Sequence, residues 1–209
     1  SWGTTLALCY AIKHPECILG LVLRGIFLGR REDITWLYEK GGVSEFFPEA
    51  FDRYVSIIPE EERHDIIGSY YKRLTSEDRK TREEAAREWS IWEGSVMTLH
   101  PVPNVEESAG EINFALSVAT IECHFWMNDM FWDGDDNWLL NNVSAIKDIP
   151  TYIVHGRYDV DCRPINAYKL SKKLNNCDLD FVISGHSSAE PAIVDALVRA
   201  TDRFKEILK

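Results

Sequence analysis

Nearly continuous apolar runs alternate with helical patterns along this chain. Residues 5–12 favour a helix that stops at His14-Pro15. Three short runs, residues 17–23, 151–155 and 179–183, are almost wholly apolar, as in strands that are buried on both faces. Residues 164–174 and the stretch after Pro191 have helical patterns. This alternation predicts an α/β fold with a parallel sheet and flanking helices.

A long insert separates the first predicted strand from the second. It covers residues 46–146 and has mainly helical patterns, which predicts a helical cap over the sheet. We therefore expect residues 1–45 and 147–209 to form the two parts of one α/β core. The sequence Thr81-Arg-Glu-Glu84 matches a capping box and predicts the start of one cap helix.

Two cap helices each show an apolar stripe with a glutamate beside it. The first stripe consists of Ala85, Trp89 and Trp92, and Glu93 follows Trp89 by four residues. The second consists of Phe114, Val118, Ile121 and Phe125, and Glu122 follows Val118 by four. A glutamate at the edge of a stripe can simply reach solvent. Two of them in one acidic region suggest a shared pocket for a cation.

Charge is unevenly distributed along the 209 residues. The chain has 23 Lys plus Arg against 34 Asp plus Glu, a net charge of −11. Residues 88–146 contain no Lys or Arg, ten acids and five of the seven tryptophans. The acidity argues against nucleic acid and membrane surfaces as partners. The acidic, aromatic segment suggests a surface that receives a cation with an apolar body, although a solvated acidic region remains the alternative.

The cysteines give no sign of a metal or disulfide framework. There are five, they are scattered, and none forms a C-x-x-C pair. The sequence predicts no metal, no cofactor and a reducing, cytoplasmic location.

Three residues at predicted strand or helix ends suggest covalent catalysis. Ser1-Trp2-Gly3 leads directly into a helix and matches the second half of a G-x-S-x-G nucleophile elbow. Asp159 follows the second strand, and His186 follows the third. The order Ser, Asp, His is that of α/β-hydrolases. Alone, Ser1 could equally be an N-cap serine.

Other assignments compete with this triad. Asp161 and His155 lie near the same strand end but lack the expected spacing from glycine. Ser1 could instead act as an N-terminal nucleophile with its own amine as base. That chemistry occurs on antiparallel sheets, which the parallel pattern disfavours.

An elbow at Ser1 requires a preceding strand and glycine. We therefore expect the sequence to be the C-terminal part of a larger hydrolase whose N-terminal strands are missing. By itself such a chain would lack one oxyanion donor and expose a sheet edge, which predicts an inactive, aggregation-prone fragment.

The motifs together resemble the prolyl aminopeptidase, or proline iminopeptidase, family of serine α/β-hydrolases. The matching stretches span residues 1–204: Ser-Trp-Gly-Thr-Thr-Leu-Ala-Leu at 1–8, Leu-Arg-Gly-Ile-Phe at 23–27, Phe-Phe-Pro-Glu at 46–49, Trp-Glu-Gly at 92–94, Ile-Glu-x-His-Phe at 121–125, His-Gly-Arg-Tyr-Asp at 155–159, Gly-His-Ser at 185–187 and Ala-Thr-Asp-Arg-Phe at 200–204. The resemblance implies release of N-terminal proline from peptides without a metal.

The resemblance also implies roles for individual residues. Ser1 would be the nucleophile, His186 the base and Asp159 the acid that orients it, and the Trp2 backbone N–H would be one oxyanion donor. Glu93 and Glu122 would hold the free amine of the substrate, and Phe27 and Trp126 would line the proline pocket. Three residues depart from the usual family pattern: Trp126, Cys123 and Leu37 stand where Phe, Asn and Tyr are common. The alternatives are another α/β-hydrolase, such as an esterase or amidase, or a non-catalytic truncated chain.

Overall fold

The computed structural model describes residues 1–101 and 103–207. The strands are β1 (Leu21–Arg24), β2 (Thr151–Gly156) and β3 (Cys177–Val182). The α-helices are α1 (Trp2–Lys13), α2 (Arg31–Tyr38), α3 (Pro48–Val55), α4 (Ile66–Leu74), α5 (Arg79–Val96), α6 (Val105–Ala109), α7 (Ile112–Met127), α8 (Trp138–Asn142), α9 (Pro164–Ser171) and α10 (Pro191–Ile207). Short 3₁₀ helices lie at Pro15–Cys17, Val43–Glu45, Glu60–Glu62, Asp129–Phe131 and Val143–Ile146.

The chain divides into two compact units. The first comprises residues 1–33, 97–100 and 137–209, and the second comprises residues 34–96 and 101–136. The expected cap, residues 46–146, overlaps most of the second unit, but the compact unit begins 12 residues earlier and ends ten residues earlier. The domain limits at residues 45 and 146 stay a prediction.

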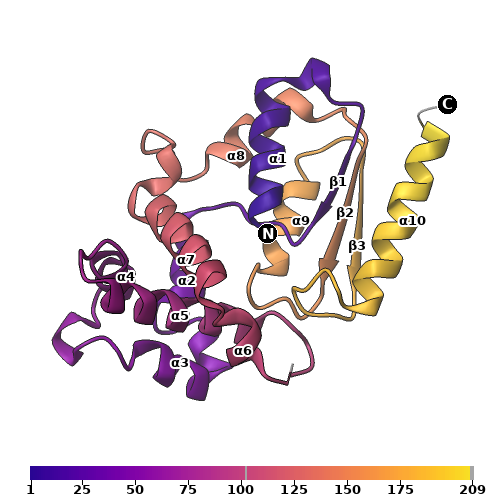
Figure 1. The fold of residues 1–209 in the computed structure, drawn as a ribbon. Helices are drawn as coiled ribbons and strands as arrows, with labels where there is room; N and C mark the ends of the chain where they lie inside the picture. The colour runs from indigo at the N-terminus through magenta and orange to yellow at the C-terminus, as the bar shows by residue number, and fades with distance from the viewer. Residues whose placement is uncertain (102, 208–209) are drawn as a thin grey trace. The chain divides into compact units, whose positions relative to one another are not determined.

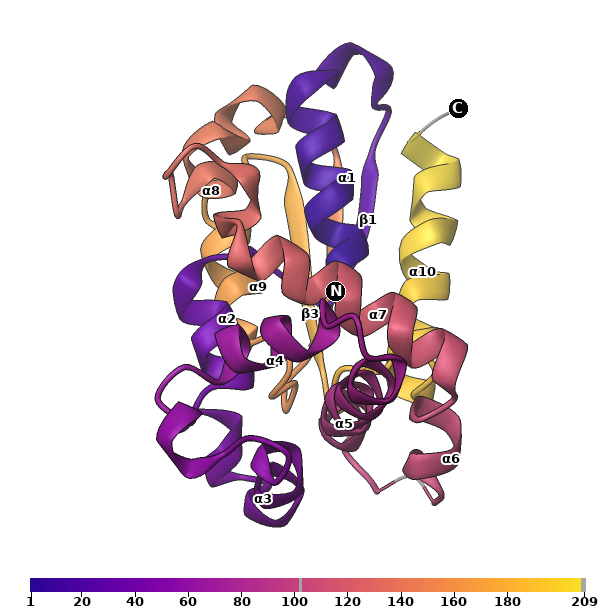
Figure 2. The ribbon, with the colours of Figure 1, turned by 60° about the vertical axis from the view of Figure 1, so that its left-hand side comes forward.

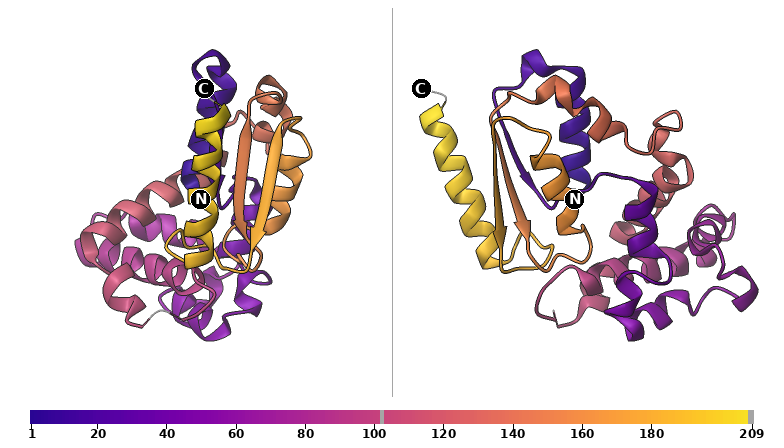
Figure 3. Two further views of the ribbon diagram at one scale, coloured as in Figure 1. Left: turned by 90° about the vertical axis from the view of Figure 1, so that its right-hand side faces the viewer. Right: turned by 180° about the vertical axis from the view of Figure 1, so that it is seen from behind.

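The first unit is a parallel sheet with helices on both faces. Its strands are ordered β1-β2-β3, and both neighbouring pairs run parallel. Helix α10 covers one face, and α1 and α9 lie on the other (Figure 1; Figure 3, right). Ile193, Ala196 and Ala200 of α10 pack against Tyr152 and Val154 of β2. The expected α/β fold with flanking helices is confirmed.

The three strands differ in how far they are buried. Every residue of β2 is buried, as its apolar run predicts, because it lies between two strands and two layers of helices. Strand β1 begins at Leu21, four residues later than expected, since Pro15–Cys17 forms a 3₁₀ turn instead. The expectation that β3 is buried on both faces is wrong, because in the described part of the chain it pairs only with β2 and most of its residues are half exposed.

The second unit is helical and is built around aromatic side chains. Helix α5 packs against α7, α4 and α3, and the crossing of α5 and α7 is visible in Figure 2. Tyr54 stacks on Tyr70 with ring centroids 4.6 Å apart, and Trp92 stacks on Tyr54 at 5.5 Å. Trp89 stacks on Tyr38 at 4.3 Å. The predicted stripe of Ala85, Trp89 and Trp92 is buried, and it forms much of this core.

The expected start of the first cap helix at Thr81 is wrong. Helix α5 begins at Arg79, and its cap is Asp78, whose Oδ2 accepts hydrogen bonds from Thr81 N (2.9 Å) and Thr81 Oγ1 (2.7 Å). The carboxylate of Asp78 thus takes the place that the capping box assigned to Thr81.

The predicted stripe of α7 does not face the core. Phe114 and Ile121 are each 54% exposed, and Val118 and Phe125 are half buried. The buried face consists instead of Ala115, Ala119, Cys123 and Trp126. Small residues at two of these positions allow α7 to approach the bulky tryptophans of α5 closely. No helix in the described ranges is long and apolar enough to cross a membrane.

Candidate active site

The loops that follow β2 and β3 bring Asp159 and His186 together. His186 Nδ1 lies 2.9 Å from Asp159 Oδ2, and both side chains are almost fully buried. The backbone N–H of Cys162 donates to the other carboxylate oxygen, Asp159 Oδ1, at 2.8 Å. Parallel strands end at the same edge of a sheet, and for this reason residues 27 positions apart meet here.

Arg24 fixes the tautomer of His186. Its Nη1 lies 2.9 Å from His186 Nε2 and donates to the His186 carbonyl oxygen at 2.9 Å. A guanidinium has only donors, so Nε2 must accept and the ring proton must be on Nδ1, facing Asp159. This is the neutral form that a general base needs, with its lone pair directed away from the carboxylate.

Ser1 lies beside this pair, at the N-terminal end of α1. Its backbone nitrogen donates to the carbonyl oxygen of Arg24 at 3.0 Å and also to that of Gly25. Gly25 has a φ of +62°, and a Cβ there would lie 2.9 Å from His186 Cε1 and 3.3 Å from Ser1 N. Ser1 and His186 therefore flank the same glycine, and the first unit brings all three predicted triad residues to one place.

Burial shifts both members of the pair toward their neutral forms. Loss of water raises the pKa of Asp159 to about 6, although His155 and the Cys162 N–H oppose this shift. The same loss of water lowers the pKa of His186 to about 4, against the attraction of Asp161. The imidazole is consequently uncharged at neutral pH.

The two competing residues have different places in the structure. His155 is fully buried, its Nδ1 accepts from the Ile26 N–H at 3.1 Å, and its Nε2 lies 2.7 Å from the Cys162 carbonyl oxygen. It therefore links the ends of β1 and β2 to the loop that holds Asp159. Asp161 is also buried, with its Oδ2 4.0 Å from His186 Nε2 and no hydrogen-bond partner for that oxygen in the described chain.

One group of potential metal ligands occurs within residues 1–101 and 103–207. Ligand atoms of Asp161, Cys162 and His186 lie within 4.8 Å of one another, and all three residues are buried. The guanidinium of Arg24 lies at the histidine nitrogen and opposes a cation there. Burial also raises the pKa of the Cys162 thiol well above its ordinary value, which disfavours the thiolate that a metal requires.

Phe27 and the start of α1 are held to each other by backbone contacts. The Phe27 N–H donates to Thr4 Oγ1 at 3.1 Å, and Thr5 Oγ1 donates to the Phe27 carbonyl oxygen at 2.8 Å. The Phe27 side chain is 7% exposed. Trp2 is the first residue of α1, at the positive end of the helix dipole.

The second unit contains the other predicted substrate residues. Glu122 Oε2 accepts hydrogen bonds from Trp89 Nε1 at 2.9 Å and from the Tyr38 hydroxyl at 3.4 Å. The buried Trp126 ring lies 6.2 Å from the Tyr38 ring. Glu93 is half buried and follows Trp89 by one helical turn, so it lies on the side of α5 that contacts Glu122.

The prediction from sequence missed Arg24 and Tyr38. Arg24 is the last residue of β1, and the only signal for it was a charge at the end of an apolar strand. Tyr38 is separated from Glu122 by 84 residues, and nothing in the local pattern connects them.

Comparison with known proteins agrees with this fold. The family model described as "alpha/beta hydrolase fold" matches residues 1–191. The chain belongs to the alpha/beta hydrolase fold family. Among solved structures, an "alpha/beta fold family hydrolase" from Bacillus anthracis str. Sterne has a TM-score of 0.51 at 17% identity over 98% of this chain and 62% of that one. A putative lipase from Acinetobacter baumannii AYE has a TM-score of 0.57 at 15% identity over 98% of this chain and 58% of that one.

Curated relatives in sequence carry a more specific name. The chain is 47% identical to the "Probable proline iminopeptidase" of Leptolyngbya boryana, over 98% of this chain and 63% of that protein. It is 47% identical to the "Proline iminopeptidase" of Xylella fastidiosa (strain 9a5c), over 98% and 65%. It is 42% identical to the "Proline iminopeptidase" of Arabidopsis thaliana, over 100% of this chain and 55% of that protein. The chain thus spans less than two thirds of these relatives, and the resemblance seen in the sequence is confirmed.

Proposed function

We propose that this alpha/beta hydrolase chain carries the catalytic residues of an aminopeptidase that releases N-terminal proline from peptides. The observation that supports it most is the buried Asp159–His186 pair, with His186 Nε2 as acceptor and Ser1 at the same glycine. The names of the curated relatives favour proline as the residue released.

In the proposed mechanism, His186 takes the proton of the Ser1 hydroxyl as Ser1 attacks the prolyl carbonyl. Nε2 must then face Ser1 Oγ, in the place where Arg24 donates in this structure. Asp159 stabilises the imidazolium that forms. The Trp2 backbone N–H, at the positive end of α1, contributes to binding the oxyanion. His186 then returns the proton to the leaving amine, and water hydrolyses the acyl-enzyme.

Glu93 and Glu122 would bind the free amine of the substrate. Trp89 and Tyr38 orient the Glu122 carboxylate by donating to it, which prepares it to accept an ammonium group without first losing side-chain freedom. Two charge-assisted contacts of about 1.5–3 kcal/mol each would favour a free amine over a blocked one by about 10² to 10⁴. Trp126, buried against Tyr38, would be part of an apolar wall for the proline ring.

The test uses the full-length protein and three substrates: a proline anilide, its N-acetyl form, and a simple ester that has no amine. We expect Glu93→Gln and Glu122→Gln to raise KM for the free anilide and to leave ester hydrolysis unchanged. Glu107→Gln, which removes an exposed acid of α6, is the matched control. Equal turnover of the free and acetylated anilides would contradict the amine pocket and favour an esterase or amidase.

The nucleophile is tested separately. A fluorophosphonate should attach covalently to Ser1, and mass spectrometry of the peptide that contains Ser1 should show the adduct. Labelling elsewhere, or undiminished hydrolysis by Ser1→Ala, would exclude the proposed triad.

A further inference from the structure

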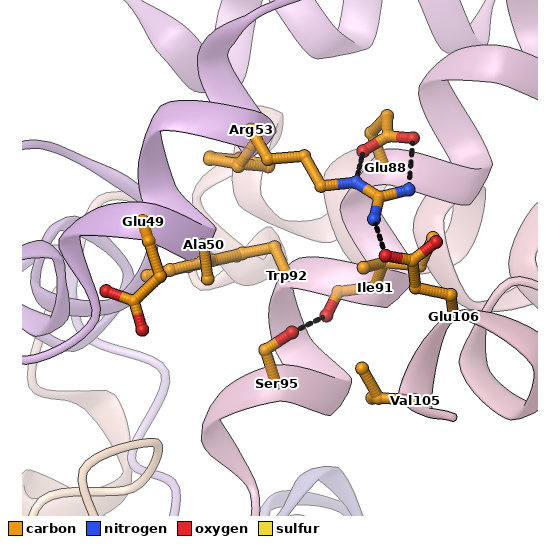
Figure 4. A pocket seen from close by; sticks show the side chains of 10 residues that line it. Glu49, Ala50, Arg53, Glu88, Ile91, Trp92, Ser95, Val105 and Glu106 are labelled. Carbon is orange, nitrogen blue, oxygen red and sulfur yellow. Dashed lines mark hydrogen bonds and ion pairs between the residues drawn. The ribbon is translucent and has the colours of Figure 1, made fainter. Parts of the chain in front are cut away.

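The second unit has a small cavity between α3, α5 and α6. Its volume is about 220 Å³, and its lining includes side chains from all three helices (Figure 4). Cavities for drug-sized ligands are typically about 300–1,000 Å³. This one therefore suits a single side chain or a molecule of similar size. None of the residues that line it belongs to the proposed triad or amine pocket.

Carboxylates dominate the charged part of the lining. Arg53 forms two hydrogen bonds with Glu88, of 2.7 Å from Nε and 3.2 Å from Nη2, and its Nη1 also contacts Glu106. Glu49, one helical turn before Arg53 on α3, adds a third carboxylate. One positive charge thus faces three negative charges, and the lining is electrostatically suited to a cation. An anion would have to compete with Glu88 and Glu106 for a guanidinium that both already bind.

The rest of the lining is apolar and would accept an aliphatic stem. Trp92, Ile91, Val105 and Ala50 contribute to it. In Figure 4, Glu49 lies on one side of Trp92 and Ala50, and the Arg53–Glu106 pair lies on the other. A flexible stem lying along this wall would place a cationic head within reach of a carboxylate at either side.

The charge of the chain strengthens this attraction. Residues 88–146, which provide Glu88 and Glu106, contain ten acids and no Lys or Arg. A surface of one sign raises the local concentration of opposite charges and accelerates their arrival. Glu106 is 64% exposed, so it can turn toward an incoming cation at little cost, whereas Glu88 is only 13% exposed and stays with Arg53.

We propose that this cavity binds the cationic side chain, arginine or lysine, of a peptide or protein partner. The ammonium or guanidinium pairs with Glu49 at one side of the apolar wall, and the aliphatic stem lies against Trp92 and Ala50. The site is separate from the residues proposed to bind the substrate amine, so it is a second recognition site for a positively charged chain.

The experiment is a calorimetric titration of the full-length protein at low ionic strength. The probes are N-acetyl-arginine amide and N-acetyl-citrulline amide, which differ by one charge but have nearly the same shape. We expect the arginine probe to bind at least tenfold more tightly, and 0.5 M salt to weaken it strongly because the cavity is open to solvent. An acetylated peptide with one internal arginine should bind at least as tightly as the small probe.

Two variants locate the binding. Glu49→Gln should weaken the arginine probe about tenfold, since it removes one charge-assisted contact. Glu60→Gln removes an equally exposed acid outside the cavity and should change nothing. Ala50→Phe fills the cavity without changing its charge and should abolish binding. Equal affinity for arginine and citrulline, or unchanged binding to Ala50→Phe, would overturn the proposal, because the cation would then be held by diffuse surface charge.

Discussion

Gly25→Ala tests the contact between Gly25, which directly follows β1, and His186, the proposed base. Gly25 has a φ of +62°, and an added Cβ would lie 2.9 Å from His186 Cε1 and 3.2 Å from His186 Nδ1. The left-handed backbone alone costs an alanine about 1–2 kcal/mol. The contact adds a second effect, because the imidazole must move by a few tenths of an ångström.

His186 has little freedom to make that movement. Asp159 holds its Nδ1 at 2.9 Å, and Arg24 holds both its Nε2 and its carbonyl oxygen at 2.9 Å. A displacement of about 1 Å in a catalytic group can cost about 100-fold in rate. For a smaller shift we expect kcat on the proline anilide to fall about tenfold, in addition to a loss of about 1–2 kcal/mol in the free energy of unfolding.

Gly134→Ala provides the matched control. Gly134 has a φ of +83°, and a Cβ there would contact nothing within 4 Å. Urea unfolding should show a similar loss of stability in both variants, whereas anilide hydrolysis should fall only in Gly25→Ala. If kcat is unchanged in Gly25→Ala while its stability falls, His186 is not confined by β1 and the reasoning is refuted.

Three further substitutions test the same unit. Asp159→Asn should lower kcat by about 10³ to 10⁴, because an amide does not stabilise the imidazolium of His186; a loss below tenfold would remove Asp159 from the triad. Asp33→Ala should cost about 3 kcal/mol in urea unfolding, since it removes a buried carboxylate that pairs with both Arg30 (2.9 Å) and Arg163 (2.6 Å), while Asp178→Ala, which breaks an exposed pair, should cost under about 1 kcal/mol. Burial raises the pKa of Asp161, so the folded chain keeps this proton to higher pH than the unfolded chain, and the associated stability is lost as pH rises. Asp161→Asn should therefore gain stability relative to the parent as pH rises above the ordinary aspartate pKa, and parallel stability curves would contradict this.

The sequence was sufficient for features that depend on local pattern. The apolar run of β2 predicted a strand buried on both faces, because a central parallel strand contacts helices on each side. The positions of Asp159 and His186 after two neighbouring parallel strands predicted that these two residues meet, because the carboxyl ends of parallel strands lie at one edge. The acidity of residues 88–146 follows directly from their composition, which includes ten acids and no Lys or Arg.

Tertiary packing decided what local pattern could not. Periodicity favoured the face of α7 with Phe114 and Ile121, yet the buried face is the one with Ala115 and Ala119, where α7 packs against α5. The Tyr38 hydroxyl donates a hydrogen bond to Glu122, although the two residues are 84 positions apart in the sequence.

The protonation state of His186 likewise depends on the tertiary structure. Arg24 reaches His186 Nε2 across 162 positions in the sequence, and burial lowers the pKa of His186 to about 4. The sequence thus determined which strand ends carry Asp159 and His186. The structure determined which atoms of these side chains donate or accept hydrogen bonds and which are buried away from water, because those properties depend on neighbours that are distant in the chain.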